Sequence, residues 1–198
     1  MKSLAALLAA LRADLDATGV RWALVGGLAV SARTEPRFTR DVDVAVGVAD
    51  DAAAEALVRS LSARGWRAAA AVEQQAAGRL ASVRLVPPGG AASGRVADVL
   101  FSSSGIEREL VERAESLEIL PGVFAPTARV GHLLALKVLA RDDSRRPQDR
   151  VDAVALIRVA SPAELDLARR SLELVTSRGH HRGKDLPAEL EELLRATA

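Results

Sequence analysis

Leucines recur at helical spacing at the start of the chain. They fall on one face of a 3.6-residue repeat and predict an amphipathic helix: Leu4, Leu7, Leu8, Leu11 and Leu15. Ser3 stands where a side-chain oxygen can cap the first free amides, and Gly19 is a suitable terminator. The continuous apolar run at 22–25 then indicates a short buried strand that leads into Gly26-Gly27.

The rest of the pattern divides into a mixed half and a helical half. Apolar or alternating runs predict strands at 22–25, 41–46, 66–72, 80–86 and 96–101, and 117–123 is a last short strand or a loop. Helices are predicted from 28 to 32, from 50 to a stop at Gly65, and over 107–115. Beyond Pro126 the pattern is helical throughout, at 128–141, 147–159, 162–177 and 187–196. We therefore predict an α+β fold, with a mixed β-sheet flanked by helices over 1–125 and a C-terminal helical bundle over 126–198.

Composition narrows the class of protein only modestly. A chain of 198 residues fits one domain, or one domain with a helical appendage, and its net charge of +1 argues against a polybasic nucleic-acid coat. The chain has no cysteine, which is compatible with a reducing, cytoplasmic location. Arg12, Asp14 and Asp16 interrupt the apolar start, and no stretch reaches the ~18 uncharged apolar residues of a membrane span. We expect no membrane association.

Asp41 and Asp43 are the first candidates for chemistry. Residues two apart in a strand face the same side at ~3.3 Å per residue, so the two carboxylates would project together. Oxygen ligands suit hard divalent cations, and two such ions ~3.5 to 4 Å apart can clamp the attacking and leaving oxygens of a nucleotidyl transfer. Acid pairs are commonly just solvated, but the alternating valines indicate a buried strand, where a carboxylate needs a partner.

Gly26 and Gly27 fit such a site for a separate reason. They lie between a predicted strand and a predicted helix. Without a Cβ the backbone can approach a polyphosphate closely, and amides at a helix start point towards it. A plain turn is the simpler interpretation of a double glycine taken alone.

These residues together resemble a known family. The run 24–29, followed by Arg37-x-Thr39-x-Asp41-Val42-Asp43, is similar to the signature of AbiEii/AbiGii toxin-type nucleotidyltransferases within the DNA polymerase β-like superfamily. The resemblance implies a nucleotidyltransferase-like fold in which Asp41, Asp43 and a third acid on a later strand hold two Mg²⁺ ions, or Mn²⁺ in their place. Asp98 within the apolar run 96–101 is the best match for that third acid, and Glu73 is the reserve.

The resemblance continues into the helical half. Lys137 is one of only three lysines among 27 basic residues, and it lies in the apolar run 133–140. It resembles the family's helix lysine and would reach the triphosphate, while Asp149 would orient Lys137 or the nucleotide. The alternatives are a snorkelling lysine and an ordinary acid at a helix start. The resemblance also implies that the remaining motif residues contact the NTP: Gly26, Gly27, Arg37 and Thr39.

The implied activity is transfer of NMP from an NTP to an acceptor, for example tRNA or another RNA, by the toxin of a toxin–antitoxin or phage-defence pair with a cognate antitoxin protein. A transferase that inactivates an antibiotic, and a nucleotide-binding module without turnover, are the alternatives. The arginines at 141, 145, 146 and 150 could dock RNA or form a solvated helix face. His180 and His181 are interpreted as part of a solvated linker, and His132 as a packing or capping residue.

Overall fold

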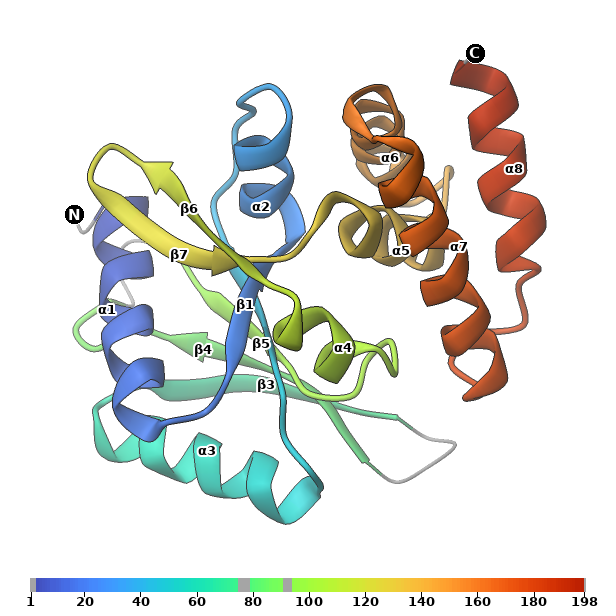
Figure 1. Ribbon diagram of the computed structural model, residues 1–198. Coiled ribbons are helices and arrows are strands. Elements are labelled where there is room, and N and C mark those ends of the chain that lie inside the picture. Colours follow the sequence, from blue (N-terminus) through green and yellow to red (C-terminus); the bar gives the residue numbers. More distant parts are fainter. Residues whose placement is uncertain (1–2, 75–78, 91–93, 198) are drawn as a thin grey trace.

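A mixed β-sheet forms the centre of the computed structural model, which describes residues 3–74, 79–90 and 94–197 (Figure 1). Over these residues the sheet has seven strands in the order β3-β4-β5-β2-β1-β7-β6. The pairs β2·β5 and β1·β7 are parallel and the other four are antiparallel. The strands are β1 (Trp22–Val25), β2 (Val42–Val46), β3 (Arg67–Gln74), β4 (Arg79–Val86), β5 (Ala97–Leu100), β6 (Glu115–Leu120) and β7 (Val123–Thr127).

The helices fall into two groups. Helices α1 (Leu4–Thr18), α3 (Asp51–Ala63) and α4 (Glu107–Glu112) pack on the strands, whereas the last four gather beside the sheet (Figure 1). Helix α2 (Gly26–Arg33) follows β1 directly and contacts both the sheet and two helices of the second group. That group consists of α5 (Val130–Ala140), α6 (Pro147–Val159), α7 (Pro162–Ser177) and α8 (Leu186–Thr197). The predicted α+β fold is confirmed.

Local signals account for several of the helix ends. The Ser3 hydroxyl accepts a hydrogen bond from the Ala6 amide at 3.1 Å, and α1 ends at Gly19 in the left-handed conformation. The predicted leucine face of α1 is buried. Helix α7 begins after Ser161, whose hydroxyl accepts from the Glu164 amide, with Pro162 as its first residue. Because caps and periodicity agree, these elements lie where the sequence predicted them.

The segment before the helical half differs from the prediction. Instead of one short strand or loop at 117–123, a hairpin forms from β6 and β7, turning at Pro121-Gly122. Strand β7 adds to the sheet beside β1, through the pair Leu24 and Thr127. The sheet therefore runs two residues past residue 125, and the division of the chain into two domains stays a prediction.

Smaller corrections concern element ends near the site. Helix α2 begins at Gly26 rather than at Leu28, so both glycines form its first turn. Strand β2 begins at Val42, which leaves Asp41 just outside it, and α4 ends at Glu112, before the predicted 115. Among the described residues no helix combines the length and apolar character that a membrane crossing requires.

Candidate active site

Three neighbouring strands bring charged side chains into one row across the sheet. Asp43 of β2 is in register with Asp98 of β5, and Asp98 is in register with Arg84 of β4. Side chains at paired positions share a face of the sheet, and those one residue further along take the other face. Val44 and Val99, at those next positions, are fully buried. The charged row therefore lies on the face opposite the packed valines, and Val25 continues the row to the start of α2.

The surroundings of Asp43 raise the pKa of its carboxyl group and so disfavour the charged form. Burial raises its pKa to about 6, and the charges of Asp98 and Asp41 act in the same direction. Lys137 and a hydrogen bond from the Gly27 amide act against this rise. A carboxylate crowded by two other acids is short of positive charge, which is the environment that a divalent cation would relieve.

Asp98 has a protein partner that the sequence did not reveal. Arg84 Nε and Nη2 donate to the two oxygens of Asp98 at 2.9 and 2.7 Å. Hydrogen bonds from Arg84 to Asp98, followed by the charge of Asp98, raise the pKa of Arg84 above its usual range. The Asp98 side chain is only 17% exposed, whereas that of Arg84 is 49% exposed. The predicted third acid, Asp98, is thus paired with an arginine, whose side chain is long and has a planar guanidinium group.

The two glycines make room for charged side chains of the protein itself. Gly26 has a φ of +64°, and a Cβ there would lie 2.0 Å from Asp43 Oδ2. A Cβ on Gly27 would lie 2.6 Å from Arg37 Nη2. The double glycine therefore lets Asp43 and Arg37 approach the first turn of α2, in addition to any approach of a phosphate.

Lys137 lies at the centre of an ion-pair network. Its Nζ is 2.8 Å from Asp149 Oδ1 and 2.8 Å from Asp152 Oδ2, and its side chain is 12% exposed. A snorkelling lysine would place its ammonium group in water, so that alternative does not describe this residue. Asp149 also pairs with Arg146 at 2.9 Å. The contact between Asp149 and Lys137 exists as the resemblance implied, whereas the role of either residue in nucleotide binding stays a prediction.

Asp152 is the residue of this network to which sequence reasoning assigned no role. It accepts from Arg37 Nε and Nη2 at 2.8 and 2.7 Å, and from Gln148 Nε2 at 2.9 Å, with its own side chain 1% exposed. Burial alone would raise the pKa of Asp152, but hydrogen bonds from Arg37, Lys137 and Gln148 lower it below its usual value. Asp152 on α6 thereby ties Arg37, from the loop after α2, to Lys137 on α5.

One cleft of about 1260 Å³ contains every predicted site residue. The cleft lies between the charged row of the sheet and helices α5 and α6. Thr39 lies on its wall and directs its hydroxyl towards the Asp41 carbonyl oxygen at 3.5 Å. The predicted residues that line it are Gly26, Gly27, Arg37, Thr39, Asp41, Asp43, Asp98, Lys137 and Asp149.

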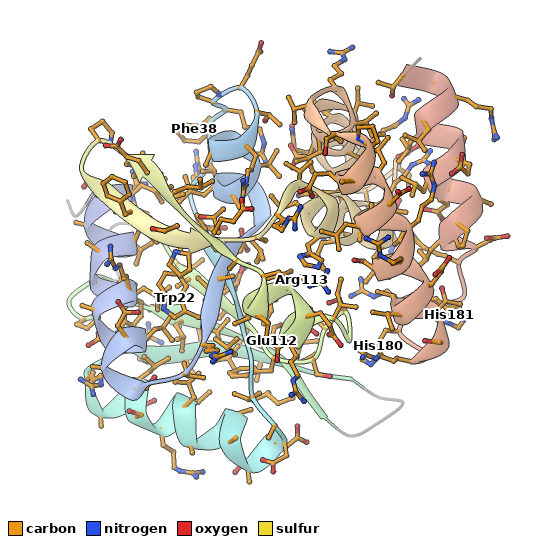
Figure 2. The ribbon with its side chains drawn as sticks, in the orientation of Figure 1. Trp22, Phe38, Glu112, Arg113, His180 and His181 are labelled. Atoms are coloured by element: carbon orange, nitrogen blue, oxygen red, sulfur yellow. The ribbon has the colours of Figure 1, made fainter. Side chains whose placement is uncertain are left out.

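The loop after α7 forms another wall of this cleft, which corrects its interpretation as a solvated linker. His180 packs on Gly105, where a Cβ would meet the imidazole ring at 2.7 Å, and it lies beside the turn before α4 (Figure 2). Arg182 donates to the Ser103 carbonyl at 3.1 Å. The Glu107 carboxylate fixes that turn by accepting from the Ser104 amide and hydroxyl. The contacts of His180 and Arg182 join segments more than 70 residues apart, which no local pattern reveals.

The remaining candidate residues are His132 and Glu73. His132 is a packing residue, because it is 1% exposed inside α5 and does not cap the helix. Burial lowers its pKa to about 4. The side chain of Glu73, the reserve third acid, lies outside the described part of the structure, although its backbone pairs with Leu80.

The acids fit a metal by donor chemistry, although they are not gathered into a ready cluster. Within the described ranges no three His, Asp or Glu side chains stand close enough together to hold an ion. Arg84 donates hydrogen bonds to Asp98, and the pKa of Asp43 is raised because Asp43 is buried and lies near other acids. Asp41, Asp43 and Asp98 nevertheless offer only oxygen ligands, which hard divalent cations prefer.

Comparison with known proteins first identifies the class of fold. A crystal structure of an antigenic nucleotidyltransferase-like protein from Paracoccidioides brasiliensis is similar, with a TM-score of 0.53, 22% identity, and coverage of 95% of this chain and 92% of that one. The antibiotic-resistance factor ANT(2'')-Ia matches with a TM-score of 0.47, 18% identity, and coverage of 97% and 89%. The lincosamide antibiotic adenylyltransferase LnuA matches with a TM-score of 0.46, 14% identity, and coverage of 78% and 96%. The fold is therefore that of nucleotidyltransferases.

The family follows from the sequence match. The family model described as "Nucleotidyl transferase AbiEii toxin, Type IV TA system" matches residues 7–198, so the chain belongs to the AbiEii nucleotidyltransferase family. This match includes the middle of the chain and its last 40 residues, which the motifs alone did not cover. A search among curated proteins found no match.

Proposed function

We propose that this protein transfers NMP from an NTP to a hydroxyl acceptor and releases pyrophosphate, with Mg²⁺ or Mn²⁺ as the metal. The observation that carries the proposal is the convergence of two groups on one cleft. The charged row of the sheet lies on one wall, and Lys137, paired with two aspartates, lies on the other. Metal-binding oxygens and a cation for phosphate are the groups that nucleotidyl transfer requires.

Each side chain has a task in this reaction. Asp41, Asp43 and Asp98 would hold the divalent ions, which supply positive charge to the attacking and leaving oxygens. Asp98 would accept the proton of the acceptor hydroxyl. The hydroxyl oxygen would then bond to the α-phosphorus, while the bond between that phosphorus and the oxygen that bridges to the β-phosphate breaks. Lys137 would neutralise the charge that develops on the pyrophosphate. Arg37, Thr39 and the amides of Gly26 and Gly27 would position the triphosphate, and Asp149 would orient Lys137.

Asp43→Asn tests the site directly. The wild-type protein is incubated with each α-labelled NTP, Mg²⁺, and total RNA and protein extract. We expect label to move to an acceptor, and Asp43→Asn to lower the rate by at least ~10²-fold, as loss of a preorganised electrostatic group does. Asp166→Asn is the matched control, because Asp166 is 59% exposed in an ion pair outside the cleft. Equal labelling by Asp43→Asn and the control would refute the proposal.

We propose RNA as the acceptor class. Arg145, Arg146 and Arg182 line the cleft, which supports this proposal because contacts to phosphate dominate the binding of nucleic acid. Label recovered in RNA, with a rate that falls as salt rises, is the expected result. Label recovered on an aminoglycoside or another drug instead would assign the protein to the antibiotic-modifying alternative. NTP binding without any transfer would identify a binding module.

We further propose that the protein acts in the cytoplasm as the toxin of a toxin–antitoxin pair. Membership of the AbiEii family supports this role, and it implies a cognate antitoxin. Induced expression of the wild type should arrest growth, Asp43→Asn should not, and co-expression of the neighbouring gene should restore growth. Normal growth under wild-type induction, with the protein shown to be active in vitro, would contradict the toxin role.

A further inference from the structure

Arg84 forms an ion pair with Asp98, one of the carboxylates of the proposed metal site. Its guanidinium group uses one lone pair on each oxygen of Asp98, at 2.9 and 2.7 Å. A divalent ion shared between Asp43 and Asp98 would have to approach the same carboxylate. Two cations on one carboxylate repel each other strongly where water is partly excluded, so ion and guanidinium compete.

We propose that Arg84 is the built-in counter-ion of the metal-free site, and that a divalent cation must displace it from Asp98 in order to bind. Arg84 is thus a positioning residue that sets the metal affinity. This inference rests on the proposed function only in taking Asp41, Asp43 and Asp98 as the metal ligands.

The two partners differ in their freedom to move. Asp98 lies within the sheet between β2 and β4, and its side chain is 17% exposed. Arg84 reaches it from β4 with a long side chain that is 49% exposed and lines the open cleft. When the pair separates, Asp98 therefore stays in place while the guanidinium group moves into the cleft.

Arg84 also compensates the other acids when no metal is bound. The charges of Asp41 and Asp43 add to that of Asp98 in favouring the charged form of Arg84. Without Arg84 three carboxylates would face one cleft, and Lys137, a cation whose charge acts on Asp43, is already paired with Asp149 and Asp152. The guanidinium group therefore stabilises the empty site and competes with the loaded one.

Metal titration of Arg84 variants tests the inference without any turnover. Mn²⁺ binding to the full chain is measured by electron paramagnetic resonance in the absence of NTP. We expect Arg84→Met to bind Mn²⁺ about tenfold more tightly than the wild type, which corresponds to ~1.4 kcal/mol. Arg84→Lys keeps the charge but loses the two-pronged geometry, so it should bind roughly threefold more tightly. Arg59→Met removes the same charge from an exposed pair with Glu55 and should match the wild type.

Thermal unfolding supplies a second readout. Without metal, Arg84→Met should unfold at a lower temperature than the wild type, and Mg²⁺ should raise the unfolding temperature of the variant more than that of the wild type. If Arg84→Met does not fold without metal, Arg84→Lys alone decides the question. Mn²⁺ affinity that is unchanged or weaker in the folded variants, or no Mn²⁺ binding in wild type and variants, would overturn the inference.

The outcomes also separate this inference from the proposed function. Transfer of label by the wild type, together with no gain in Mn²⁺ affinity on loss of Arg84, would refute the counter-ion role alone. Tighter Mn²⁺ binding by Arg84→Met, with no transfer by the wild type, would refute nucleotidyl transfer alone.

Discussion

Replacing Asp152 by asparagine should both destabilise the protein and disable the cleft. Asp152 is 1% exposed and accepts hydrogen bonds from Arg37, Lys137 and Gln148. Asparagine keeps the shape but removes the negative charge, which leaves Lys137 with Asp149 alone and Arg37 with no carboxylate.

The size of the effect follows from the burial of the partners. Breaking a fully buried ion pair costs about 3–5 kcal/mol. Arg37 is 28% exposed and Lys137 12% exposed, so water partly compensates the stranded charges. We therefore expect Asp152→Asn to lower the free energy of unfolding by about 2–3 kcal/mol, which lowers Tm by roughly 5–10 °C in a chain of this size.

Urea unfolding of the variant and a matched control measures this cost. Asp166→Asn removes the same charge from an exposed pair with Arg169 and should change the free energy of unfolding by less than ~0.5 kcal/mol. In the transfer assay, under conditions where both variants are folded, Asp152→Asn should lower kcat/KM at least ~10-fold because Arg37 and Lys137 lose their anchor. If the two variants are equally stable and equally active, the network has no structural or positioning role.

Two further substitutions probe the site and its support. Gly26→Ala should lose activity, and it should lower the free energy of unfolding by at least ~1 kcal/mol more than Gly122→Ala does. Both glycines have a positive φ (+64° and +76°), but only the Cβ at 26 meets the Asp43 carboxylate. Equal costs in urea unfolding would contradict this prediction. His132 makes stability depend on pH: its pKa is about 4 in the folded protein against an ordinary value of 6.5, so the unfolded chain binds a proton first as pH falls. The contribution of His132 to stability should be greatest above pH 6.5 and fall by about 3 kcal/mol towards pH 4, whereas Asp43, whose pKa is raised to about 6, changes stability in the opposite direction over the same range. The unfolding free energy at about pH 7 minus that at about pH 4.5 should be lower in His132→Gln than in the wild type, and an unchanged value would refute the role of His132.

Sequence patterns predicted most of the fold because they are local. The spacing of leucines and the caps Ser3 and Ser161 depend on neighbours within one helical turn, and they located α1 and α7 closely. The hairpin of β6 and β7 was missed because its exposed strand has no clean alternation, although Pro121-Gly122 is a turn signal that could have found it.

The site was predicted in part for the same reason. Asp41, Asp43 and the double glycine form one short motif, whereas Arg84 becomes a partner of Asp98 only through the register of β4 with β5. Asp152 could have been given a role from its spacing, because it stands one helical turn after Asp149 and both acids reach Lys137. The packing of His180 on Gly105 depends on contacts between distant segments and had no signal in the sequence.

The ion pair between Arg37 and Asp152 also bears on synthesis of the chain. The two residues are 115 positions apart, and the chain emerges from the ribosome with its N-terminal end first. The double glycine, the acids and the strands that carry them are synthesised early. Asp152, which pairs with Arg37 and Lys137, is synthesised only with α6. In a nascent chain that ends before α6, Arg37 and Lys137 lack the Asp152 carboxylate, so their ion-pair network can form only late in translation.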